Sequence, residues 1–179
     1  NWFVPAELYF GIGLHFIDSL TGWVCRSPTK IYKTSNGGYN FIEQNLFSYH
    51  QYSVEINFVN SQTGFCISNS IYGVLYKTTT SGSNWYYGAS ADYWYSSMDF
   101  VNSSTGYMIG MGFSGYVTDK FFKTTNSGDN WTAYSLNFNK NLYKLAFTSI
   151  NTGFIAGDSG IILKTTTGGI PIGVQHLGT

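Results

Sequence analysis

The chain has 179 residues, of which 43% are hydrophobic, 19% aromatic and 10% charged, and nine basic residues balance nine acidic ones. This composition is that of a folded chain with far fewer charges than the ~25% of an average protein. The lack of a basic cluster excludes an electrostatic nucleic-acid binder, and the lack of an apolar run of 18 residues predicts no membrane insertion.

Residues 1–10 begin with the pair Asn1-Trp2. The same pair recurs at Asn84-Trp85 and Asn130-Trp131, where it starts the last strand of a repeated unit. We therefore expect residues 1–10 to form a spare strand that pairs outside its own part of the chain.

A signature that begins with Phe and ends with Thr-Gly and an aromatic residue then occurs four times. The copies are FIDSLTGW from Phe16, FVNSQTGF from Phe58, FVNSSTGY from Phe100 and FTSINTGF from Phe147. Apolar residues alternate with other residues before each Phe, as in Ile12 and Leu14, which indicates a strand. The Asn, Asp, Ser and Gly residues inside the signature indicate a turn.

Each signature leads into two further strands and a second repeated turn. The third strands are KIYKT, VLYKT, KFFKT and IILKT, and the turns that follow are KTSNGGYNF, KTTTSGSNW, KTTNSGDNW and KTTTGG. Asn and Thr side chains bind nearby backbone in such turns, and Gly permits the tight reversal. A fourth strand starts at Phe41, Trp85 or Trp131, whose ring we expect to plug the turn onto its unit. Four strands per unit predict an all-β chain without room for helices.

The turn resembles the Asp-box (BNR repeat) of bacterial neuraminidases, and the whole unit is similar to repeats of photosystem II assembly-factor-like and sortilin-like β-propellers. The defining Asp is replaced here, and the turn geometry is expected to survive because Asn and Thr also carry acceptor oxygens. The replacing residues are Asn36, Thr80, Asn126 and Thr167. The resemblance implies a β-propeller of four four-stranded antiparallel blades.

The propeller is predicted to span residues 1–170. Its units are expected at about 11–52, 53–95, 96–141 and 142–169, followed by a tail or linker at 171–179. Because the last unit ends after a third strand, we expect residues 1–10 to pair with it, in the same chain or in a neighbouring copy. Such pairing would hide open strand edges.

The residues argue against the chemistry that the neuraminidase resemblance suggests. A sialidase needs several arginines for the substrate carboxylate, and Arg26 is the only arginine. His15, Glu55, Asp99 and Lys144 lie in first strands and are candidates for a central channel, with ordinary contacts between blades as the alternative. The three histidines have no metal-ligand spacing. We predict no enzyme, no metal and no cofactor.

The segment 84–100 is unusually rich in aromatic residues. Its side chains are suited to a protein interface or to stacking on sugars, with packing between blades as the alternative. The interface or ligand candidates are Trp85, Tyr86, Tyr93, Trp94 and Tyr95.

Two asparagines are candidates for glycosylation, and two cysteines are candidates for a disulfide. Asn102 and Asn130 lie in glycosylation sequons, although both also occupy turn positions. Cys25 and Cys66 are offset by one position in equivalent strands and should point to opposite faces, so we expect buried free thiols rather than a disulfide.

These observations favour a non-catalytic extracellular propeller that binds another protein or assembles with itself. The extracellular location follows from the charge-poor composition and from the tail, which resembles a linker in secreted proteins. A glycan-binding lectin is the first alternative, and a hydrolase with an unrecognised site is the second.

Overall fold

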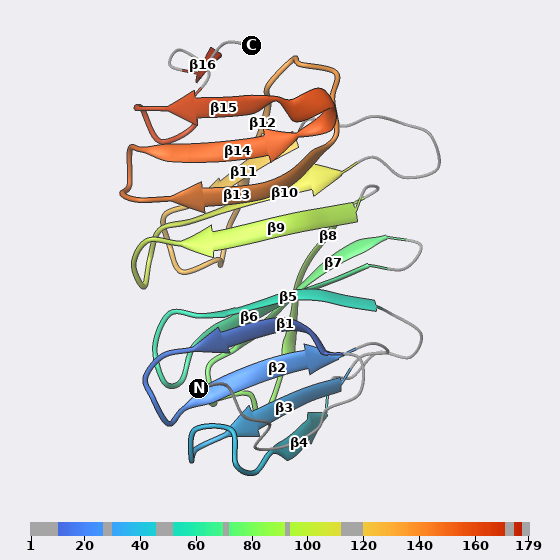
Figure 1. The fold of residues 1–179 in the computed structure, drawn as a ribbon, viewed down its shortest axis with the longest axis vertical. Helices are drawn as coiled ribbons and strands as arrows, with labels where there is room; N and C mark the ends of the chain where they lie inside the picture. The colour runs from blue at the N-terminus through green and yellow to red at the C-terminus, as the bar shows by residue number, and fades with distance from the viewer. Residues whose placement is uncertain are drawn as a thin grey trace. The chain divides into compact units, whose positions relative to one another are not determined.

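The structure is a computed structural model that describes residues 11–26, 30–45, 52–69, 72–91, 94–111, 120–170 and 174–176. These residues form sixteen β-strands and one short 3-10 turn, η1 (Asp158–Gly160), and no α-helix. The predicted all-β class is therefore confirmed. None of the described residues belongs to a helix that could cross a membrane. The chain divides into two compact units, residues 1–90 and 91–179, each of which contains two four-stranded sheets (Figure 1).

In the first unit, every strand lies beside its neighbour in sequence. The first sheet is β1 (Gly11–Phe16), β2 (Gly22–Arg26), β3 (Lys30–Thr34) and β4 (Ile42–Asn45). The second is β5 (Tyr52–Phe58), β6 (Gly64–Asn69), β7 (Gly73–Thr78) and β8 (Tyr86–Ala91). β5 begins at residue 52, one residue before the predicted start of its unit.

The second unit repeats the same plan. Its first sheet is β9 (Trp94–Phe100), β10 (Gly106–Met111), β11 (Lys120–Thr124) and β12 (Thr132–Ser135). Its second is β13 (Leu142–Phe147), β14 (Gly153–Gly157), β15 (Ile162–Thr165) and β16 (Val174–His176). β9 includes Trp94 and Tyr95, which we had assigned to the preceding unit.

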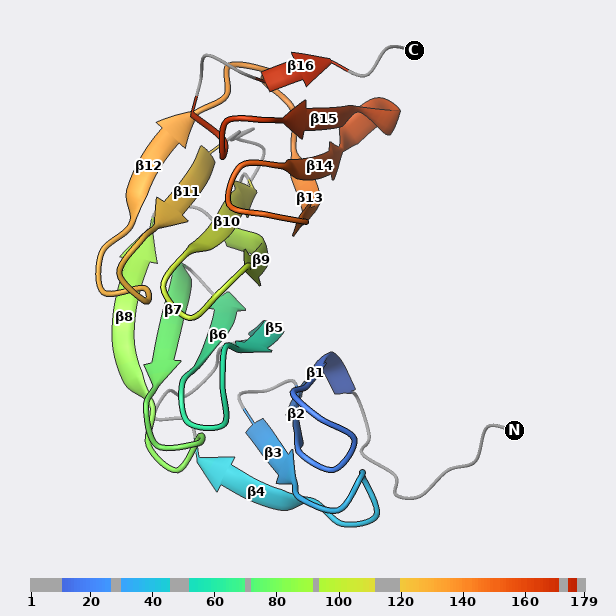
Figure 2. The same ribbon diagram turned by 90° about the vertical axis from the view of Figure 1, so that its left-hand side faces the viewer.

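β16 corrects one expectation about the last sheet. We predicted that this sheet would lack an outer strand, but β16 pairs antiparallel with β15, from Leu163 with His176 to Thr165 with Val174 (Figure 2). The repeat pattern missed β16 because the residues after Gly169 carry no copy of either signature. The predicted strand at residues 1–10 lies outside the described residues, so its pairing stays a prediction.

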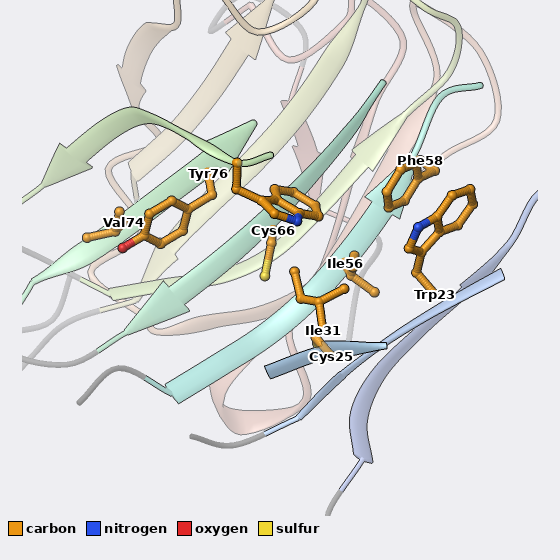
Figure 3. Close-up of a cluster of buried hydrophobic side chains, with 9 residues drawn as sticks. Trp23, Cys25, Ile31, Ile56, Phe58, Cys66, Val74 and Tyr76 are labelled. Atoms are coloured by element: carbon orange, nitrogen blue, oxygen red, sulfur yellow. The ribbon is translucent and has the colours of Figure 1, made fainter. Parts of the chain in front are cut away.

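The core of the first unit lies between its two sheets (Figure 3). The Trp23 ring from β2 stacks on the Phe58 ring from β5, with 3.5 Å between centroids and 7° between planes. Trp85 meets the Phe58 ring edge-on with 5.9 Å between centroids, so in this copy the aromatic residue after the turn packs onto its unit as predicted. Aromatic pairs of this kind contribute ~0.5–1.5 kcal/mol beyond the area that they bury.

The second unit builds its core from equivalent positions. Tyr107 stacks on Phe147 with a centroid distance of 3.6 Å and the same 7° angle. In its first sheet, Trp131 meets Phe100 edge-on at 5.9 Å, as Trp85 meets Phe58. In each unit, the signature Phe of the second sheet therefore stacks on the aromatic residue that follows Thr-Gly in the first sheet.

The two cysteines are buried free thiols, as predicted. Their one-residue offset places them on opposite faces of their own sheets, yet both belong to the same core. This is possible because the first sheet contributes one face to that core and the second sheet contributes the other (Figure 3).

Candidate functional site

The repeated turn is organised by a buried threonine hydroxyl. In the third copy, Thr124 Oγ1 accepts hydrogen bonds from Asn126 N at 3.3 Å and from Gly128 N at 3.0 Å. In the other three copies, the backbone N–H groups two and four residues later in the chain donate to the threonine Oγ1 in the same way. These threonines are Thr34, Thr78 and Thr165. All four threonines are at most 6% exposed, so each satisfies backbone donors that would otherwise be buried without a partner.

The residues at the box Asp position also hold the turn. Asn126 Oδ1 accepts a hydrogen bond from Asn130 N at 3.0 Å, and Asn36 does the same for Asn40. Thr80 Oγ1 accepts from Asn84 N at 3.0 Å. In these three copies a neutral side-chain oxygen at the box position therefore accepts a backbone hydrogen bond within the turn.

Each of these turns is attached to the Thr-Gly turn of its own sheet. Backbone N–H groups of Gly37, Ser81, Ser127 and Gly168 donate to carbonyls of Leu20, Gln62, Ser104 and Asn151 at 2.8–2.9 Å. The Thr-Gly turns are themselves closed by one side-chain oxygen that accepts two backbone N–H groups. That oxygen belongs to Asp18, Asn60, Asn102 or Ser149.

A lysine links neighbouring sheets within each unit. Lys33 Nζ lies 5.3 Å from the centroid of the Trp23 ring and donates to Ser81 Oγ, in the turn of the next sheet, at 2.6 Å. Lys123 Nζ lies 5.6 Å from the Tyr107 ring and donates to Gly168 O at 3.3 Å. The sequence did not lead us to predict this role. A signal for it exists, since each lysine pairs in register with the aromatic residue after Thr-Gly.

A groove lies beside the turn of β11 and β12 in the second unit. It has a volume of about 340 Å³ and a mixed polar and apolar lining. Most of its lining side chains are exposed hydroxyl or amide groups, and Tyr134 and Ile170 supply apolar surface. The lining residues are Lys123, Thr125, Asn126, Asn130, Thr132, Tyr134 and Ile170. Such a groove offers hydrogen-bond partners and an apolar contact to an extended chain.

Two of the predicted aromatic candidates are buried and cannot contribute to an exposed binding surface. Trp85 and Tyr95 are buried, at 3% and 2% exposure, and Tyr95 packs edge-on against Phe122 at 5.7 Å. Tyr86 is exposed on β8 and Trp94 is half-buried on β9. Tyr93 lies outside the described residues. The two buried rings serve packing in the structure.

The central-channel candidates are placed in two units. His15 on β1 and Glu55 on β5 belong to the first unit and are half-buried. In the second unit, Asp99 Oδ2 accepts a hydrogen bond from the backbone N of Phe147 at 2.7 Å, which joins β9 to β13, and Lys144 is exposed. Asp99 therefore makes a polar contact between sheets. For the other three residues, a place in a central channel stays a prediction.

The shifted pKa values have structural causes. Backbone N–H groups of Leu20 and Thr21, each 2.7 Å away, lower the pKa of Asp18. A hydrogen bond from Lys30 at 2.6 Å lowers the pKa of Glu43 and raises that of Lys30.

The remaining shifts belong to the second unit. A hydrogen bond from the Tyr143 hydroxyl, and then one from Asn141 N, lower the pKa of Asp158, and the same carboxylate raises the pKa of Tyr143. Burial, followed by the charge of Asp99, raises the pKa of Tyr107. These groups close turns or join strands, and the described residues include no cluster of three His, Cys, Asp or Glu side chains that could hold a metal.

Both glycosylation candidates are exposed turn residues. Asn102 Oδ1 accepts hydrogen bonds from the backbone N of Ser104 and Thr105. Asn130 lies in the lining of the groove, so a glycan on its side chain would compete with any ligand there.

Neither a protein-family model nor a curated protein sequence matches this chain. Solved structures do match. YCF48 from Cyanidioschyzon merolae has a TM-score of 0.74 and 13% identity over 97% of this chain and 58% of its own. YCF48 bound to D1 peptide has a TM-score of 0.59 and 14% identity over 94% of this chain and 82% of its own. An ancestral GH74 enzyme has a TM-score of 0.69 and 16% identity over 91% of this chain and 24% of its own.

These similarities confirm the predicted resemblance to photosystem II assembly-factor-like propeller repeats and, with the four antiparallel sheets, the β-propeller class. At such low identity they concern the fold alone. The chain spans 58% of the Cyanidioschyzon merolae YCF48 and 24% of the GH74 enzyme.

Proposed function

We propose that this chain is a non-catalytic propeller module that binds another protein through the groove beside the turn of β11 and β12. The groove is the observation that carries the proposal, since its 340 Å³ is lined by exposed amide and hydroxyl groups around Tyr134 and Ile170. Tyrosine is among the side chains enriched at interfaces between proteins. The solved complex of YCF48 with D1 peptide supports the proposal, because it shows a propeller of similar fold that binds a polypeptide.

The rigidity of the groove also favours binding. Thr124 and Asn126 fix the turn that forms one wall, and Lys123 is held against the Tyr107 ring and Gly168 O. A wall that is ordered before binding loses little entropy when the ligand arrives. Because each shifted pKa has a structural partner, the titratable groups supply no independent argument for catalysis. The low charge content supports an extracellular location for the module.

The glycan alternative receives less support from β8. Tyr86 and Tyr87 are exposed, at 55% and 62%, but successive residues of a strand point to opposite faces. Tyr87 moreover meets the Tyr76 ring edge-on at 6.4 Å. The two rings therefore do not form one platform for a sugar.

The proposal is tested with a random peptide display library and a glycan array, each offered to the 179-residue chain. Thr125→Arg places a long side chain in the groove, and Thr79→Arg makes the same change at the equivalent exposed position of the first unit. We expect selected peptides that bind the parent chain and Thr79→Arg but bind Thr125→Arg at least ~10-fold more weakly, a loss of about 1.4 kcal/mol. No selected peptide, or an equal loss in both variants, contradicts the proposal, as does binding of glycans alone.

A further inference from the structure

One face of the first sheet is exposed, although the equivalent face of the second sheet in each unit is buried. Leu14 on β1 is 66% exposed, whereas its equivalents Ile56 and Leu145 are 2% and 3% exposed. Phe16 is 38% exposed, whereas Phe58 is 3% and Phe147 is 8% exposed. We call the surface formed by Leu14 and Phe16 the entry face, because in each unit the corresponding residues receive the sheet that precedes them.

The opposite kind of face is exposed on the last sheet. Ile162 on β15 is 48% exposed, whereas its equivalents Ile31 and Phe121 are completely buried. On β14, Phe154 is half-buried and Ala156 is exposed. The first sheet of each unit has a fully buried ring at the position of Phe154, Trp23 in one and Tyr107 in the other. We call the surface of Phe154, Ala156 and Ile162 the exit face.

The exit face has the components of a completed interface. Lys164 pairs with Phe154 in register and its Nζ lies 5.8 Å from the ring centroid. The same arrangement of lysine over aromatic ring occurs at Lys33 with Trp23 and at Lys123 with Tyr107. In those two cases the opposite side of the ring stacks on a signature Phe of the next sheet, at 3.5 and 3.6 Å.

The entry face carries the complementary signature Phe. Phe16 ends β1 as Phe58 ends β5 and Phe147 ends β13, and in all three sheets this Phe covers a glycine of the adjacent strand, Gly22, Gly64 or Gly153. The described contacts within each unit thus define both halves of the interface that the entry and exit faces could form.

We propose that the exit face of one copy of this chain docks on the entry face of a second copy, with Phe154 stacked on Phe16. Within its own unit each face is exposed, with Leu14 at 66% and Ile162 at 48%, so a second copy can reach it. Buried apolar area drives the association, and large exposed apolar patches are characteristic of interaction surfaces. The contact joins two different surfaces, so it closes into a ring or continues into a filament. It uses no residue of the groove and goes beyond the binding of another protein there.

The proposal is tested by analytical ultracentrifugation of the 179-residue chain over a range of concentrations. Wild-type protein is expected to exceed the monomer mass of 19.9 kDa. Leu14→Asp and Ile162→Asp each bury a charge at one half of the contact, and each should weaken association at least ~10-fold. Both positions are largely solvent-exposed in one copy, so the variants are expected to fold.

Mixing the two variants gives the decisive result. Leu14→Asp keeps an intact exit face and Ile162→Asp keeps an intact entry face, so the mixture should form a 1:1 complex and stop there. Ile42→Asp is the control, because Ile42 is 71% exposed and pairs with Lys33, on the face opposite to Leu14. A wild-type monomer at every concentration, a mixture that fails to associate, or an equal effect of Ile42→Asp overturns the proposal.

Discussion

The hydroxyl of Thr124 is expected to contribute more to stability than the shape of its side chain. Thr124 is 1% exposed, and its oxygen accepts hydrogen bonds from Gly128 N and Asn126 N. Replacement by Val keeps the volume and the branching at Cβ but removes the one oxygen that accepts both hydrogen bonds. A buried donor that loses its partner costs ~1–3 kcal/mol. The Gly128 bond is buried and the Asn126 bond is longer, so we expect Thr124→Val to lower the free energy of unfolding by ~2–4 kcal/mol.

Thr124→Ser provides the comparison, because it keeps the hydroxyl and removes one methyl group. Loss of a buried methyl costs about 0.8 kcal/mol in transfer free energy. The serine variant should therefore be the more stable of the two, although valine is closer in shape to threonine. Thr125→Val is the control, since Thr125 is exposed and a surface change of this kind usually stays within ~0.5 kcal/mol.

Urea unfolding measures the order of these variants through the shift of the midpoint at an unchanged slope. The expected order of midpoints is wild type and Thr125→Val, then Thr124→Ser, then Thr124→Val. If Thr124→Val unfolds at the same urea concentration as Thr124→Ser or at a higher one, the hydroxyl does not hold the turn.

Three further predictions concern the turns and the core. Gly169→Ala should lower the free energy of unfolding by ~2–4 kcal/mol, because a Cβ there would lie 2.2 Å from the Phe121 ring and the backbone φ is +79°. Gly160→Ala should cost only ~1–2 kcal/mol, because its Cβ would enter open space and only the φ of +74° is unfavourable. Thermal unfolding compares the two variants, and equal losses contradict this reasoning. Asp18 has a lowered pKa, so its contribution to stability is present above the unfolded pKa of about 3.9 and disappears as pH falls through the folded pKa. Asp18→Asn should therefore reduce the loss of Tm between pH 5 and pH 2. A pH profile identical to that of the wild type contradicts this role of Asp18. Cys25 and Cys66 are completely buried, so a thiol reagent should modify neither in folded protein and both in denaturant, and rapid modification of the folded chain contradicts the described core.

Much of the local structure could be predicted because the interacting groups lie close together in the sequence. The Thr-x-x-x-Gly spacing places a hydroxyl and the backbone N–H that it binds in one turn, and the aromatic residue that follows meets the nearest signature Phe. The contacts between sheets could not be predicted in this way. The two cysteines share a core because facing sheets use opposite faces, which is a property of the packed pair and not of either strand.

The candidate site was predicted less well than the fold. The aromatic segment at 84–100 attracted attention by composition, but burial of Trp85 and Tyr95 assigns those rings to packing. The groove depends on Ile170, which follows the last turn and has no counterpart in the repeat signatures. Its position next to Asn130 results from packing within the second unit, which no short motif specifies.

The central claim is that four copies of one threonine-centred turn hold four equivalent sheets, and amide hydrogen exchange measured by NMR tests it most directly. The amides of Gly38, Gly82, Gly128 and Gly169 each donate to a buried threonine Oγ1 at 2.9–3.0 Å. We expect all four to exchange at least ~100-fold more slowly than in an unfolded chain, although they lie in turns. Exchange of any one of them at the unfolded rate would contradict the claim.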